Sequence, residues 1–202
     1  MRLALGPVLG LAALVLSVLP AAAQRIPVSE IDRYLNSFSS ARAAFTQLNA
    51  DGTISTGDLS LRRPGRARFD YDPPNDGLVI AGGGQVAVFD PVSNTPPEQY
   101  PLSETPLSLI LAGRVDLSRS GLVAGQGGDA TRTSVTLRDP DRPEAGTIQL
   151  VLTPNPTTLR QWVITDDGGQ ATTVILGDME TGVGLGANLF SIPGEVSRRG
   201  LN

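Results

Sequence analysis

The chain has 202 residues and a formal net charge of −4, and all 16 of its basic residues are arginine. It contains no cysteine and no histidine, which excludes disulfide bonds, thiolate and imidazole metal sites, cysteine nucleophiles and Ser-His-Asp triads. The acidic balance and the lack of lysine argue against a nucleic-acid partner. The 23 glycines and 16 prolines are spread along the chain, which indicates many short strands joined by turns.

The N-terminal segment has the organisation of a secretory signal peptide. Arg2 precedes the apolar run Leu3–Leu19, and Ala21-Ala22-Ala23 has the small-x-small form of a signal peptidase site. We therefore expect residues 1–23 to be a cleaved signal peptide and residues 24–202 to form a single domain outside the cytoplasm. An uncleaved anchor helix is the alternative, because the apolar run approaches the length of a membrane span.

The first elements of the mature chain are a helix and a strand. Ser29 has the position of a helix cap, and the residues after it place one apolar stripe on a helix: Ile31, Tyr34, Leu35 and Phe38. Strand character follows at Ala43–Asn49 and ends at the hairpin signal Asp51-Gly52. The helix is too short to be stable alone, so it must pack on the strands.

The segment from Gly57 to Arg63 alternates apolar and polar residues, as a strand with one buried face does. Leu59 and Leu61 share the apolar face, and Arg63 breaks the pattern because it lies on that same face. After Pro64-Gly65 the alternation resumes, with one apolar face (Ala67, Phe69, Tyr71) and one polar face (Arg66, Arg68, Asp70).

The rest of the chain continues as a meander of short strands. A second helix is expected after Thr105-Pro106, with Thr105 as its cap and Gly113 as its end. The final residues Ser197–Asn202 are polar and are expected to fray. The expected strands are Leu78–Ala81, Gln85–Phe89, Glu98–Leu102, Leu122–Ala124, Ala130–Arg138, Thr147–Thr153, Leu159–Thr165 and Gln170–Gly177, and Asn188–Phe190 is a last turn or short strand.

Nine to eleven strands in a meander curl into a barrel or a strongly bent sheet. Two helices lie at chain positions from which they can cover its open side. Such a sheet either fills its interior with its own aliphatic side chains or leaves an apolar cavity for a guest, and composition alone does not decide between the two. Trp162 is expected in the core or at a rim, on the strand face opposite Leu159.

Five segments in order resemble the periplasmic lipoprotein carrier family, LolA. They are Ala44-Phe45-Thr46-Gln47, Gly57–Pro64, Phe69–Pro74, Gly84–Pro91 and Thr105–Leu111. The resemblance runs from about Ile26 to Ile192. It implies a mainly β fold with a few helices, in which a half-open antiparallel β-barrel of about 9–11 strands is covered by a helical lid.

The resemblance also implies a function. A LolA-like protein is a soluble, non-enzymatic periplasmic carrier that shelters the acyl chains of lipoproteins released by an inner-membrane ABC transporter of the LolCDE type. It delivers them to a LolB-type receptor in the outer membrane. The implied protein is a monomer without cofactor, metal or nucleic acid. A non-enzymatic envelope lipid-binding or sensor module of the same fold is the alternative.

The resemblance assigns roles to individual residues, and each of these residues also has a purely structural interpretation. Arg63 matches the family's lid-gating arginine, which bonds to the covering helices; otherwise it is a strand-end arginine that reaches solvent. Arg62, Arg66 and Arg68 form a candidate partner-docking patch or an ordinary solvated face. The candidate cavity residues, which alternatively form a self-filled core, are Leu59, Leu61, Phe69, Tyr71, Ile80, Val86, Val88, Leu107, Ile110 and Leu111. No catalytic residues are expected, because no carboxylate pair has a nucleophile or base beside it.

Overall fold

The computed structural model describes residues 25–201, so the predicted signal peptide lies outside the described residues. The helices of this part are α1 (Val28–Leu35), α2 (Leu107–Leu111) and α3 (Ile192–Arg199). The strands are β1 (Ser40–Leu48), β2 (Ile54–Arg62), β3 (Arg66–Tyr71), β4 (Leu78–Gly82), β5 (Gln85–Phe89), β6 (Glu98–Pro101), β7 (Val123–Gly128), β8 (Thr133–Leu137), β9 (Thr147–Thr153), β10 (Thr158–Thr165), β11 (Ala171–Leu176) and β12 (Glu180–Thr181). Short 3-10 turns lie at Leu102–Glu104, Pro143–Ala145 and Ala187–Phe190.

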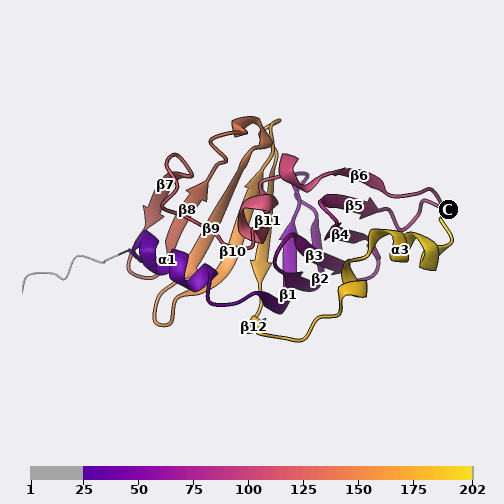
Figure 1. The fold of residues 1–202 in the computed structure, drawn as a ribbon, viewed down its shortest axis with the longest axis horizontal. Helices are drawn as coiled ribbons and strands as arrows, with labels where there is room; N and C mark the ends of the chain where they lie inside the picture. Colours follow the sequence, from indigo (N-terminus) through magenta and orange to yellow (C-terminus); the bar gives the residue numbers. More distant parts are fainter. Residues whose placement is uncertain (1–24, 202) are drawn as a thin grey trace, which may run out of the picture.

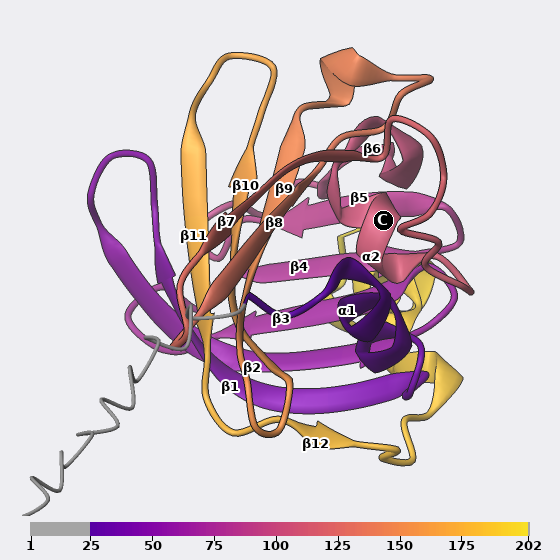
Figure 2. The same ribbon diagram turned by 90° about the vertical axis from the view of Figure 1, so that its left-hand side faces the viewer.

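Within residues 25–201 the strands form one sheet of 12 strands, paired throughout in the antiparallel sense. Its order is β6-β5-β4-β3-β2-β1-β11-β10-β9-β8-β7, and β12 pairs with one end of β1. Figure 1 shows β7–β11 and β1–β6 as two halves of this sheet. Figure 2 shows the strands of one half crossing those of the other, so the sheet is strongly bent. The mainly β, half-open architecture is confirmed; the extra strand is the two-residue β12.

The concave face of the bent sheet carries the main apolar core. Side chains from every second position of the strands meet there, among them Phe45, Phe69 and Leu150. Helices α1 and α2 cover this face: Ile31 and Leu35 of α1 and Ile110 and Leu111 of α2 are buried in the same cluster. We refer to α1 and α2 together as the cover.

The cover differs in detail from the sequence expectation. Helix α1 begins after Pro27, whose carbonyl accepts from the Glu30 and Ile31 amides, so Ser29 lies inside the helix rather than at its cap. The helix ends at Leu35, and Phe38 therefore contributes to the apolar surface from beyond the helix. Helix α2 begins after Pro106, one residue later than the expected cap at Thr105.

The convex face is covered over β4 and β5 by α3, near the C-terminus (Figure 1). Ile80 and Phe89 form a second apolar cluster there with Ile192 of α3. The prediction that Ser197–Asn202 frays is wrong as far as Arg199, because that segment continues α3. Ser191 caps the helix by accepting from the Gly194 amide at 3.1 Å, and Gly200 ends it in the left-handed conformation.

Close packing of this layer explains a glycine in β4. A Cβ atom on Gly82 would lie 2.1 Å from the carbonyl oxygen of Phe190, in the turn that precedes α3. Only glycine allows the backbones to approach so closely. No helix among residues 25–201 is long and apolar enough to cross a membrane.

Candidate functional site

A pocket with a volume of about 710 Å³ opens on the concave face. This is within the usual range for small-molecule sites, about 300–1,000 Å³. Its walls come from both halves of the sheet, from the segment that leads into α2 and from the turn at Pro143–Ala145. We call it the principal pocket.

The floor of the principal pocket is apolar and its edge is polar. The apolar lining residues are Phe69, Tyr71, Val79, Val86, Leu107, Trp162, Ile164 and Val174. The Tyr71 hydroxyl donates to Gln47 Oε1 at 2.8 Å, so this polar group is satisfied by the protein, and burial raises the pKa of Tyr71. The floor therefore offers an aliphatic and aromatic surface to an apolar guest.

Charged side chains at the edge of the principal pocket are mostly acidic. Four exposed carboxylates line the pocket: Glu104, Glu144, Asp166 and Asp167. The single guanidinium among the lining residues, Arg142, is drawn away by Asp139, to which its Nη2 donates at 3.2 Å. The edge is therefore unfavourable for an anionic group.

Arg63 joins the sheet to both helices of the cover. It directly follows β2, and its side chain is only 7% exposed. Nε donates to the Ile110 carbonyl of α2 at 2.8 Å, while Nη1 donates to the Leu35 carbonyl at the end of α1 and to the Phe38 carbonyl at 3.4 Å. The guanidinium also lies 5.1 Å from the centre of the Phe38 ring.

The electrostatic setting of Arg63 is unusual for a buried cation. Within residues 25–201 no carboxylate forms an ion pair with it, and its partners are the carbonyl groups at the C-terminal ends of two helices. Such carbonyls carry partial negative charge and favour a cation. Burial lowers the pKa of Arg63, although the nearby Tyr34 partly opposes this shift.

The space directly beneath Arg63 is almost filled. A small apolar cavity of about 20 Å³ remains there, and we call it the inner cavity. Three of the candidate cavity residues, Leu59, Leu61 and Ile110, line it, together with Trp162. A chain longer than a single small group would enter here only if the cover moved.

The other candidate cavity residues are divided among different places. Phe69, Tyr71, Val86 and Leu107 line the principal pocket. Val88 lines a second pocket of about 500 Å³, which shares Gln47, Tyr71 and Val79 with the principal one. Leu111 is packed in the main core.

Ile80 is on the wrong face for a cavity residue. It pairs with Arg68 and packs on the convex side of the sheet under α3. The neighbouring Val79 pairs with Phe69 and faces the principal pocket. Because β4 is apolar on both faces, its sequence contains no alternation from which the inner face can be recognised.

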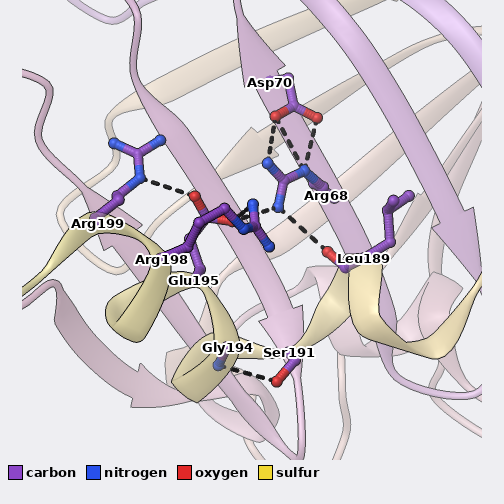
Figure 3. Close-up of polar contacts among 8 residues, drawn as sticks. All are labelled: Arg68, Asp70, Leu189, Ser191, Gly194, Glu195, Arg198 and Arg199. Atoms are coloured by element: carbon purple, nitrogen blue, oxygen red, sulfur yellow. Dashed lines mark hydrogen bonds and ion pairs between the residues drawn. The ribbon is translucent and has the colours of Figure 1, made fainter.

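The three candidate docking arginines do not form one free basic patch. Arg68 is held between Asp70 and Glu195, with Nη2–Oδ1 at 2.7 Å and Nη1–Oε2 at 3.0 Å, and is only 12% exposed (Figure 3). Arg62 donates to the Leu185 carbonyl at 2.7 Å, and Arg66 is half-buried. Arg68 therefore attaches α3 to the sheet, which corrects its expected place on an exposed surface.

The structure adds Trp162 to the pocket wall. A bulge between Leu159 and Gln161 places Leu159 and Trp162 on the same face of β10, instead of on opposite faces. Both are buried in the main core. A bulge of this kind leaves no clear mark on the alternation, so the sequence could not show which face Trp162 would join.

Comparison with known proteins agrees with this arrangement. The family model described as "Outer membrane lipoprotein carrier protein LolA" matches residues 36–193. The chain belongs to the LolA family. An outer-membrane lipoprotein carrier protein of Methylococcus capsulatus is 26% identical over 176 residues, covering 83% of this chain and 84% of its own.

Other relatives match over shorter stretches. A carrier protein of the same description from Azotobacter vinelandii is 32% identical over 123 residues, covering 56% of this chain and 58% of its own. A solved LolA-superfamily protein from Nitrosomonas europaea has 11% identity and a TM-score of 0.44, covering 82% of this chain and 98% of that one.

Proposed function

We propose that this LolA-family protein is a non-enzymatic periplasmic carrier of lipoproteins, which holds their acyl chains against the concave face of its sheet. The supporting observation is the principal pocket: an apolar floor on the concave face, beside the segment that leads into α2. Arg63, which is buried, helps to attach both helices of the cover to the sheet. Transfer then runs from an inner-membrane ABC transporter of the LolCDE type to an outer-membrane receptor of the LolB type.

The energetics of the cargo require such a surface. Exposing each methylene to water costs about 0.8 kcal/mol, so several acyl chains oppose leaving a membrane by tens of kcal/mol. A carrier offsets this cost only if it provides a comparable apolar surface. It must also release the cargo, which favours a shallow pocket and a movable cover over a closed cavity.

Arg63 can hold that cover closed, and we call its hydrogen bonds to the carbonyls of Ile110, Leu35 and Phe38 the latch. Its hydrogen bonds stabilise the closed arrangement, while burial of a cation without a carboxylate partner costs free energy. The two effects oppose each other, so the net stabilisation of the closed arrangement is smaller than the hydrogen bonds alone would give. Entry of acyl chains would then displace the cover and let the guanidinium reach water.

A capture assay with a matched pair of variants tests the carrier function. The mature protein is mixed with vesicles that contain a fluorescent triacylated lipopeptide, and the lipopeptide left in the supernatant is measured after sedimentation. We expect Ile164→Glu to lower capture at least tenfold, because it places a charge on the pocket wall. Ile175→Glu should leave capture unchanged, since Ile175 is 46% exposed on the adjacent strand, outside the pocket. Failure of the unmodified protein to capture lipopeptide, or equal capture by both variants, would contradict the proposal.

A further inference from the structure

Trp162 is the single tryptophan of the chain, and its indole N–H has no hydrogen-bond partner within residues 25–201. The side chain is 2% exposed, and Nε1 is the one buried side-chain polar atom without a hydrogen bond among the described residues. Leaving a buried donor unpaired costs about 1–3 kcal/mol, and native structures rarely do so. The exception therefore needs an explanation.

The position of Trp162 indicates where a partner would come from. Its side chain forms part of the wall of both the principal pocket and the inner cavity. Its neighbours across the sheet are Leu150 and Val174, and its ring contacts Phe69 edge to face, with the ring centres 6.4 Å apart. These side chains contain no acceptor. Nε1 itself is covered in this arrangement, so an acceptor reaches it when a guest displaces the cover from the inner cavity.

The chemistry of the indole limits what that guest group is. An indole N–H only donates, so its partner must be an acceptor. The hydrocarbon part of an acyl chain has none, whereas the ester or amide that begins each chain has a carbonyl oxygen. A carboxylate is disfavoured, because the four acidic side chains at the pocket edge oppose an anion.

We propose that Trp162 Nε1–H donates a hydrogen bond to a neutral carbonyl oxygen of the cargo, the ester or amide that attaches an acyl chain. This inference rests on the proposed carrier function and adds a specificity-determining residue to it. The first carbonyl of at least one chain enters the pocket instead of remaining at the acidic edge. The pocket then distinguishes acylated molecules from hydrocarbons, ethers and free fatty acids.

Binding of matched lipids tests the proposal. The probes are a diacylglycerol, the dialkyl diether of the same chain length and the corresponding free fatty acid, each measured by displacement of the apolar dye 1-N-phenylnaphthylamine. We expect the ester to bind the unmodified protein about 3–10-fold more tightly than the diether, as one hydrogen bond provides. The fatty acid should bind more weakly than the ester. Trp162→Phe should remove the preference by weakening ester binding alone.

A second measurement needs no variant. Because the chain has one tryptophan, its proton–nitrogen NMR spectrum contains a single indole N–H signal. We expect a downfield shift of this proton with the ester but not with the diether. Equal binding of ester and diether, a preference that survives Trp162→Phe, or an indole signal that responds alike to both lipids would overturn the inference while leaving the carrier function intact. Absence of binding by all probes would count against the carrier function itself.

Discussion

At the scale of single residues, Arg63 shows how one side chain connects three elements. It extends from the end of β2 and donates to carbonyls that terminate or follow α1 and lie in α2. The Gly65 amide adds a further bond to the Leu111 carbonyl at 2.8 Å. Backbone carbonyl groups of both helices therefore meet the sheet at this point, in addition to the buried side chains of the cover.

Replacing Arg63 by leucine tests the latch. We expect Arg63→Leu to keep the fold, because leucine fills part of the same apolar space, and to retain lipopeptide about tenfold longer when acceptor vesicles are added. The reason is that re-formation of the Arg63 hydrogen bonds closes the cover and so favours release of the lipopeptide, and leucine cannot form these bonds. Arg62→Leu is the control, since Arg62 faces the convex side and its side chain donates to the Leu185 carbonyl, away from the cover. Release rates that are the same for Arg63→Leu, Arg62→Leu and the unmodified protein would reject the role.

At the scale of elements, α3 is attached to the sheet by a charged cluster in an otherwise apolar contact. Glu195 is 3% exposed and accepts from Arg68, from Arg198 at 2.6 Å and from Arg199 at 2.9 Å (Figure 3). Burial alone would raise the pKa of Glu195, but the hydrogen bonds from Arg199 and Arg68 outweigh it and hold the pKa below its ordinary value. The carboxylate is thus stabilised in its charged form.

The lowered pKa of Glu195 makes part of the stability depend on pH. In the unfolded chain this carboxyl titrates near 4.5, and in the folded protein it titrates at a lower pH. Its contribution is therefore complete above about pH 4.5 and is lost as the pH falls through the folded value. We expect Glu195→Gln to lower the free energy of unfolding at pH 7 by about 2 kcal/mol. The difference from the unmodified protein should shrink below pH 4.5.

Urea unfolding at a series of pH values measures both effects. Asp178→Asn serves as the control, because Asp178 is fully exposed and its contact with Arg160 is 3.4 Å long. Such surface pairs contribute little, so we expect a change below about 0.5 kcal/mol. A Glu195→Gln variant that unfolds like the control at pH 7 would show that the cluster does not stabilise α3.

At the scale of the whole molecule, the sheet and the cover have different means of attachment. Each inner strand of the sheet is held by backbone ladders to two neighbours. Helices α1 and α2 are 8 and 5 residues long, too short to persist without the contacts around Arg63 and their few buried side chains. We therefore expect the cover to open more readily than the sheet.

Hydrogen exchange of the protein with and without bound lipopeptide tests this division. We expect amide exchange in the cover, and at Gly65, to become at least fivefold faster in the loaded protein. Amides of β9 and β10 should be unchanged or slower, because the sheet stays intact. Slower exchange throughout the cover on loading would mean that the cargo binds without displacing it.

Much of this architecture could be predicted from sequence, and the failures have physical causes. Arg63 was identifiable because a charge interrupted a regular alternation. Ile80 was assigned to the wrong face because both faces of β4 are covered, and α3 was missed because its anchors, Ile192 and Glu195, lie in a polar segment with proline and glycine. The face of β10 on which Trp162 lies could not be predicted, because it depends on a bulge that shifts the register without changing the composition.

The cluster beneath α3 has a consequence for how the protein is made. Ile80 and Phe89 belong to neighbouring strands, whereas Ile192 lies much later in the chain and is synthesised long after them. Until Ile192 packs on the sheet, the apolar surface of Ile80 and Phe89 on its convex side is exposed to water. A chain that ends before Ile192 would keep this apolar surface exposed, and exposed surfaces of this kind favour association with other proteins.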